Sequence, residues 1–197
     1  MERKERENAS RAINTIYELA RSNHFDWFIT LTFDKAKVNR YDYDCCADAI
    51  KHFTDILRKR GNQWLLVPEQ HKDGAYHFHG LVSGNLPLSP AIHEETGELL
   101  RDNHGRQIYN LDIYHYGFTT ATKITDAARS ATYLTKYLSK DISVPKGRKR
   151  YWASRSLNKP MVELLQMTAE EFGEIFNSSR YQKFIPSIWG DTLLCET

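Results

Sequence analysis

The sequence has few cysteines, no long apolar run and no phosphate-binding loop, and each absence excludes a class of protein. Three cysteines in 197 residues, two of them adjacent as Cys45 and Cys46, do not make a disulfide framework or a zinc site. No apolar run approaches the roughly 20 residues of a membrane-spanning helix. A G-x-x-x-x-G-K-[ST] motif is also missing, so we expect no Walker-type site and no nucleotide cofactor.

Charge of one sign is scarce over the whole chain but concentrated in one part of it. The formal net charge is only +2, whereas residues 121–160 contain ten Lys or Arg against two Asp. Such a block suits a polyanion, although a solvated surface is the commoner explanation. The charged N-terminal stretch MERKEREN has no signal-peptide core behind it. We therefore expect a cytoplasmic protein with no membrane partner.

The spacing of apolar residues predicts a mixture of helices and strands. Helices are expected over residues 5–23, 43–59, 125–141 and 161–177. Strands are expected over residues 27–33, 63–69, 75–83 and 117–124. The polar stretch 84–107 is interpreted as a long loop or an inserted hairpin, and 144–160 as a basic loop. Because strands and helices do not alternate regularly, the predicted fold class is α+β with an antiparallel sheet.

The stretch HFHG places two histidines one residue apart in a predicted strand. Since alternate residues of a strand share a face, His77, His79 and Leu81 line one side and Phe78 lies on the other, core-like side. The two imidazoles are about 6–7 Å apart along the strand, close enough to lean onto one metal ion. A metal ion needs three or four ligands, so a further ligand is expected. The alternative is two half-exposed histidines on a sheet surface.

Glu69 is the predicted third ligand, and the turn HKDGA decides whether it can reach the histidines. A two-residue loop at Asp73-Gly74 would turn Glu69 away from them and leave Gln70 as the fallback. A three-residue loop with Gly74 in the left-handed region would place Glu69 opposite His77, on the same face. We expect the second register.

The resulting His-His-carboxylate set suits Mn²⁺ or Mg²⁺, with Zn²⁺ not excluded. An ion with open coordination positions can polarise a phosphate oxygen. His71 shares the same face at the end of the hairpin and is a weaker rival ligand.

The stretch ARSATYLTKYLSKD predicts a helix with two phenols on one flank. Tyr133 and Tyr137 are i, i+4 neighbours, and Lys136 and Lys140 each follow a tyrosine by three residues. In an arbitrary helix these would be a core edge and solvated lysines. The functional interpretation is a nucleophile, because a nearby metal ion or ammonium group favours the phenolate over a phenol of pKa about 10.

These motifs, in this order, resemble those of the HUH endonucleases, specifically the rolling-circle replication initiators (Rep proteins) of two-tyrosine phages and plasmids. FITLTF resembles the first Rep motif, HFHGLV the histidine-hydrophobe-histidine motif and YLTKYLSKD the tyrosine motif. GRKRYWASRSLNKP resembles the basic segment that follows the tyrosine helix in phage-type proteins. The resemblance covers Phe25 to Pro160. Conjugative relaxases differ, because their tyrosine precedes the histidines.

The resemblance implies a fold and a division of the chain. Residues 1–160 would form a Rep domain with an RRM-like antiparallel sheet flanked by helices. The histidine motif would lie on a central strand, and the tyrosines on an adjacent helix. Residues 161–197 would form a C-terminal helical extension packed on the same domain.

The resemblance also implies an activity. Tyr133 or Tyr137 would attack a phosphodiester of single-stranded DNA at an origin, with Lys136 or Lys140 assisting. The products would be a 5′-phosphotyrosine link and a free 3′-hydroxyl that primes synthesis, and rejoining would need no ATP. Without a Walker motif, strand separation would fall to a helicase of a bacterial host, and synthesis to a host polymerase.

Two groups of residues are predicted to contact DNA. Thr30 and Thr32 present hydroxyls on one face of the first strand. The basic stretch offers cations for phosphates and rings for bases, with stacking worth about 1–3 kcal/mol per base. Its residues are Lys146, Arg148, Lys149, Arg150, Tyr151, Trp152 and Arg155. The competing functions are an HUH-type transposase, a hydrolytic metallonuclease without a covalent intermediate, and a non-catalytic RRM-like binder.

Overall fold

The computed structural model describes residues 3–139, 144–161, 166, 168–179, 181–185 and 192–196. For residues 3–7, 136–139, 181–185 and 192–196 it describes the backbone alone. The chain divides into two compact units, Met1–Pro160 and Met161–Thr197. Within the described ranges, no helix combines the length and the apolar character that crossing a bilayer requires.

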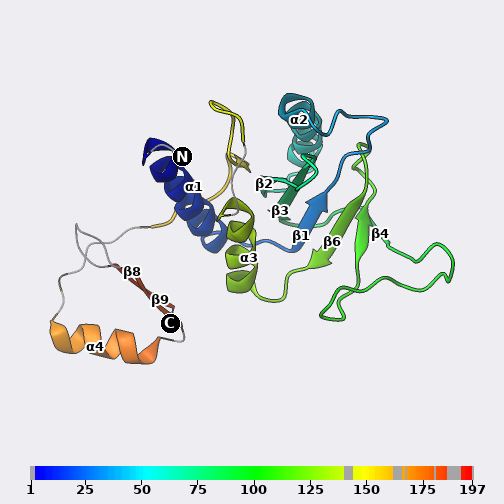
Figure 1. Cartoon of the computed structure of the whole chain (residues 1–197). Helices are drawn as coiled ribbons and strands as arrows, with labels where there is room; N and C mark the ends of the chain where they lie inside the picture. The colour runs from blue at the N-terminus through cyan, green and yellow to red at the C-terminus, as the bar shows by residue number, and fades with distance from the viewer. Residues whose placement is uncertain are drawn as a thin grey trace. The chain divides into compact units, whose positions relative to one another are not determined.

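A seven-stranded sheet forms the centre of the first unit, with the order β4-β5-β6-β1-β3-β2-β7 (Figure 1). Every neighbouring pair is antiparallel, which confirms the predicted α+β class. The strands are β1 (Trp27–Leu31), β2 (Trp64–Gln70), β3 (Tyr76–Val82), β4 (Leu88–Pro90), β5 (Tyr109–Leu111), β6 (Thr119–Lys123) and β7 (Trp152–Ala153). The two histidines of HFHG lie on β3, an interior strand hydrogen-bonded to both β1 and β2.

Helix α2 (Tyr43–Lys59) packs on one face of the sheet and has the predicted bounds. Its N-terminus is fixed by Asp42, whose carboxylate accepts hydrogen bonds from the backbone N–H groups of Asp44 and Cys45. Its buried stripe includes Ile50, Phe53 and Leu57. That stripe packs against strand residues of the same face, which include Ile29, Leu31, Leu66 and Phe78.

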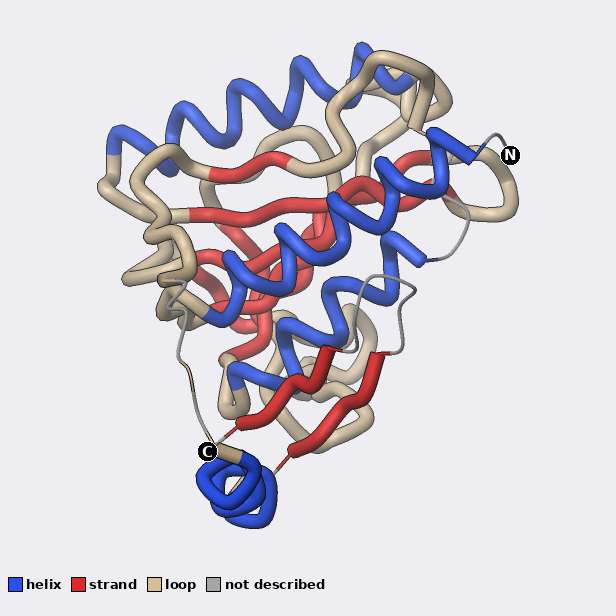
Figure 2. Tube along the Cα trace, turned by 90° about the vertical axis from the view of Figure 1, so that its left-hand side faces the viewer, coloured by secondary structure: helices blue, strands red, loops and turns tan. Residues whose placement is uncertain are grey.

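Helices α1 (Arg3–Arg21) and α3 (Ala127–Ser139) cover part of the opposite face, where Figure 2 shows helices on both sides of the strands. The apolar cluster there joins Leu65, Val67 and Leu81 of the sheet to buried residues of both helices. From the helices come Ile16, Ala20, Ala131 and Leu134. Because β2 alternates Leu65 and Val67 with Leu66, it contributes to both cores.

The structure corrects three sequence-based expectations. The basic stretch is not only a loop, because β7 pairs with β2 at the sheet edge. The stretch 84–107 holds β4 and isolated bridges between Ile92 and Leu99 and between Arg101 and Gln107, which supports the inserted-hairpin alternative.

The last helix begins later than predicted. It is α4 (Ala169–Ser178), and Thr168 caps it in a reciprocal capping box with Glu171. The second unit is also not purely helical, because a hairpin of β8 (Tyr181–Ile185) and β9 (Thr192–Glu196) follows α4. That residues 161–197 pack on the first unit stays a prediction.

Candidate functional site

The β2–β3 hairpin has the second of the two registers considered above. Glu69 pairs with His77, and His71 N–H donates to the Ala75 carbonyl at 2.9 Å, which leaves a three-residue turn. Gly74 has a φ of +88°, the left-handed conformation that such a turn needs. The prediction that Glu69 shares a sheet face with His77 and His79 is therefore confirmed.

Glu69 lies at the centre of a cluster of histidines on this face. Its Oε2 is 2.8 Å from Nε2 of His79 and 3.5 Å from Nε2 of His71. The ring of His77 stacks on that of His71, with centroids 3.8 Å apart. Thus the structure brings Glu69 to His79, diagonally across the strands, and His77 to His71.

The predicted metal ligands His77, His79 and Glu69 have donor groups that suit a divalent cation, although they are not arranged around one point. No group of three or more His, Cys, Asp or Glu side chains in the described parts of the chain is placed to hold an ion. The Glu69–His79 hydrogen bond uses the same two atoms that would face a cation. Their role as ligands stays a prediction.

His79 is buried, with its side chain only 8% exposed, and both of its ring nitrogens have partners. Nδ1 lies 3.1 Å from the hydroxyl of Thr30, across the β1–β3 ladder. A hydrogen bond at Nδ1 fixes the ring orientation and aims Nε2 at Glu69. Thr32 donates its hydroxyl proton to the Phe118 carbonyl at 2.7 Å. Both threonine hydroxyls predicted to contact DNA thus already have protein partners.

The environment of His77 makes the stability of the protein depend on pH. Burial, followed by the His71 and His79 imidazoles, lowers the pKa of His77 to about 4, against opposing effects of Glu69 and Asp73. An unfolded histidine has a pKa of about 6.5, so between these values the unfolded chain binds more protons. We therefore expect the free energy of unfolding to fall as the pH drops from about 6.5 to about 4.

Urea denaturation of the metal-free protein across this pH range measures the effect. The variant His77→Gln should show a shallower slope of unfolding free energy against pH. An identical slope in both proteins would contradict the assignment to His77.

The tyrosine helix packs on the same sheet face as the histidines. The ring of Tyr133 lies 5.3 Å from that of Phe28, whose ring lies 6.4 Å from that of His79. Tyr133 is 46% exposed. Tyr137 and Lys136 lie in the last turns of α3, where the backbone alone is described, and Lys140 lies outside the described residues.

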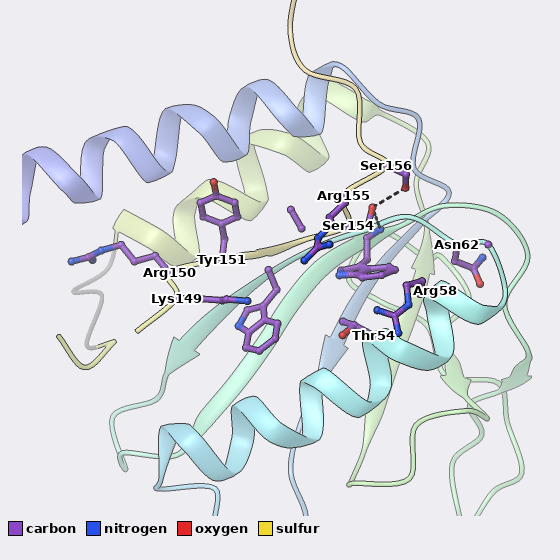
Figure 3. Close-up of a pocket in the computed structure, with 13 residues that line it drawn as sticks. Thr54, Arg58, Asn62, Lys149, Arg150, Tyr151, Ser154, Arg155 and Ser156 are labelled. Carbon is purple, nitrogen blue, oxygen red and sulfur yellow. Dashed lines mark hydrogen bonds between the residues drawn. The ribbon is translucent and has the colours of Figure 1, made fainter. Parts of the chain in front are cut away.

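The basic stretch borders a pocket of about 940 Å³ (Figure 3). Five of the predicted DNA-binding residues line it, namely Lys149, Arg150, Tyr151, Trp152 and Arg155. The remaining two are not among its lining residues: Lys146 is exposed, and Arg148 pairs with Asp44 at 2.5 Å. The segment therefore has a defined conformation against the body of the domain.

Sequence reasoning missed two features of this region. Arg58, Asn62 and Trp64, from α2 and the start of β2, form the opposite wall of the pocket. Only the sheet pairing of β7 brings them near the basic stretch, so no local signal predicts them. Phe118 was also missed: it is 81% exposed, and its carbonyl bonds Thr32 beside β1. An exposed aromatic residue flanked by polar strand residues was its one sequence signal.

Comparison with known proteins adds a family. No curated protein and no solved structure matches the chain. The family model of the ORF2-type replication-associated protein matches residues 26–142. The match spans β1 to the end of α3 and includes the histidine cluster and both candidate tyrosines. Since it covers more than half of the 197 residues, the chain belongs to this family of replication-associated proteins.

Proposed function

We propose that this replication initiator nicks and rejoins single-stranded DNA at an origin by tyrosine transesterification, as rolling-circle replication requires. Family membership supports the role in replication. One observation carries the chemistry: Tyr133 packs on Phe28, and Phe28 in turn packs on His79 of the Glu69–His79 pair. A nucleophile helix and a cluster of metal-type ligands thus share one sheet face.

In the proposed reaction a tyrosine oxygen attacks the phosphorus of one phosphodiester. The new O–P bond makes a 5′-phosphotyrosine, and the bond to the 3′-oxygen breaks. The phenol loses its proton and the leaving 3′-oxygen gains one, so no external energy source is consumed. The reverse attack by a 3′-hydroxyl rejoins the strand and frees the tyrosine. Tyr133 and Tyr137 would serve in turn, with Lys136 or Lys140 stabilising negative charge.

The cluster residues fit the binding of a divalent cation. His77, with its pKa lowered to about 4, is neutral at pH 7, as an imidazole ligand must be. Thr30 holds Nδ1 of His79, so that Nε2 is directed at the site. Mn²⁺ or Mg²⁺, held by His77, His79 and Glu69, would polarise the phosphate under attack. The protein residues hold the phosphate's surroundings fixed on an interior strand.

The function is tested by incubating the protein with single-stranded origin oligonucleotides and Mn²⁺, followed by denaturing electrophoresis. A protein band shifted by covalent DNA is expected, and a chelator should abolish it. His79→Ala should lower the adduct rate by about 100-fold or more, as loss of a metal ligand or its support does. Cleavage without any adduct would instead support a hydrolytic metallonuclease.

Phe118 is placed to stack a base near this site. Its strand position pairs with Thr32, on the face that carries Thr30 and His79. Stacking on an aromatic ring is worth about 1–3 kcal/mol, so Phe118→Ala should weaken binding of single-stranded DNA roughly tenfold. Fluorescence anisotropy measures this. Phe118→Trp should restore affinity and Phe118→Leu should not; equal affinity of the Leu variant and the native protein would rule out stacking.

A further inference from the structure

The pocket beside β7 has two walls from distant parts of the sequence (Figure 3). One wall comes from the second half of α2 and the start of β2, with Thr54, Arg58 and Trp64. The other is the basic stretch around β7. A volume of about 940 Å³ lies at the upper end of what ligand sites span, so a nucleotide or a short run of nucleotides fits.

The charge of the lining residues indicates an anionic ligand. Four cations line the pocket, namely Arg58, Lys149, Arg150 and Arg155, and none of its lining residues in the described structure is an Asp or Glu. Arg58 pairs with Asp55 at 3.0 Å, but both side chains are largely exposed, so the pair neutralises the pocket little. Several guanidinium groups facing one cavity suit phosphates, which they can bind bidentately.

The other lining groups suit a base. The indole of Trp152 lies under the Lys149 ammonium, with Nζ 4.4 Å from the ring centroid, and Trp64 and Tyr151 add further rings. Asn62 lines the same pocket, and its buried Oδ1 has no hydrogen-bond partner among the described residues. An amide oxygen of this kind can accept a proton from an amino group of a base.

The pocket is held in shape before any ligand arrives. The Tyr43 hydroxyl donates to the Lys149 carbonyl at 2.5 Å, and Ser154 N–H donates to the Trp64 carbonyl at 2.9 Å. Further along, the Gln63 amide donates to the Ser156 carbonyl at 2.6 Å. Such anchoring removes most of the ordering entropy that a mobile basic loop would lose on binding.

The pocket does not belong to the histidine site. Trp152 pairs with Leu66, whose side chain packs on the α2 face of the sheet. His79 pairs with Val67, whose side chain packs on the opposite face, beneath α1 and α3. The two sites thus lie on different faces of the sheet, near its β7 edge.

We propose that the pocket between α2 and β7 is a second binding site for single-stranded DNA. It holds phosphates on Arg58, Lys149 and Arg155 and a base against the Trp152 indole. The strand then passes around the β7 edge between this pocket and the histidine face. The proposal rests on the proposed function, since that function makes single-stranded DNA the substrate.

Binding of a fluorescein-labelled oligothymidylate of about 15 nucleotides tests the site, in a chelator so that no cleavage occurs. The double variant Arg58→Gln/Lys149→Gln should bind about tenfold more weakly. The slope of log affinity against log salt should fall by about 1.4, since each lost phosphate contact of a single strand contributes about 0.7. The control Lys59→Gln/Arg60→Gln removes the same charge from exposed residues of the same helix end, outside the pocket.

Equal losses in the two double variants would overturn the proposal, because they would reflect net charge alone; so would native affinity in the pocket variant. A fully abasic strand of equal length should bind the native protein about tenfold more weakly, from lost stacking. Equal binding of the abasic strand would reduce the pocket to a phosphate site. Adducts are assayed separately with Mn²⁺, so absent nicking with pocket-dependent binding would contradict the proposed function alone.

Discussion

The double variant Tyr133→Phe/Tyr137→Phe is expected to form no covalent adduct with DNA, a loss of about 10³-fold or more. Phenylalanine keeps the ring that packs on Phe28, at 5.3 Å in the case of residue 133, but has no oxygen to attack phosphorus. The helix should therefore stay folded while the nucleophile is lost. Denaturing electrophoresis with single-stranded origin DNA and Mn²⁺ measures the loss.

The single variants separate the two phenols. Loss of the first adduct with only one of Tyr133→Phe or Tyr137→Phe would identify the residue that attacks first. The matched control is binding of the same oligonucleotide in chelator, which the double variant should keep. An adduct that survives the double change would exclude both tyrosines as nucleophiles.

Gly117→Ala is expected to lower the free energy of unfolding by about 3 kcal/mol, at the upper end of the range for overpacking. A Cβ at this position would lie 2.3 Å from the carbonyl oxygen of Thr32 and 2.6 Å from the backbone nitrogen of Asp34. Both contacts are with backbone, so no side-chain rotation relieves them. The two flanking hydrogen bonds, from Thr32 N–H to Phe118 and from Asp34 N–H to Tyr116, would have to lengthen.

Urea denaturation of the full chain measures this loss. Thr120→Ala is the control, because Thr120 is an exposed residue of β6, on the strand that Gly117 precedes, and such changes usually stay within about 0.5 kcal/mol. Equal stability of Gly117→Ala and the native protein would show that the strands separate there without penalty.

The hairpin register was predictable because loop length, the left-handed glycine and side-chain parity all act locally. Glu69 opposite His77 follows from the turn alone. The contacts made within that face were not predictable, because long side chains reach diagonal neighbours as easily as direct ones. Glu69 therefore bonds His79, while His77 stacks on His71, the residue given the smaller role.

The basic stretch shows where sequence patterns stop being informative. Cations and rings in 146–155 indicated nucleic acid, but a two-residue strand such as β7 is too short for a periodicity. Its pairing with β2 brings Arg58 and Asn62 to face residues about 90 positions away. The pocket depends on this tertiary contact. Similarly, the start of α4 depends on the Thr168–Glu171 capping box, which a count of apolar spacing overlooks.

The position of β3 between two hydrogen-bonded neighbours limits which part of the active site can move. Its ladders to β1 and β2 fix the backbone of His77 and His79 from both sides. Helix α3 has no such ladder and is held by apolar packing of Ala131 and Leu134. If two phenols act in succession on one phosphate position, the exchange between them is therefore a rotation or slide of α3 over a stationary sheet, with the Phe28 ring as the bearing surface.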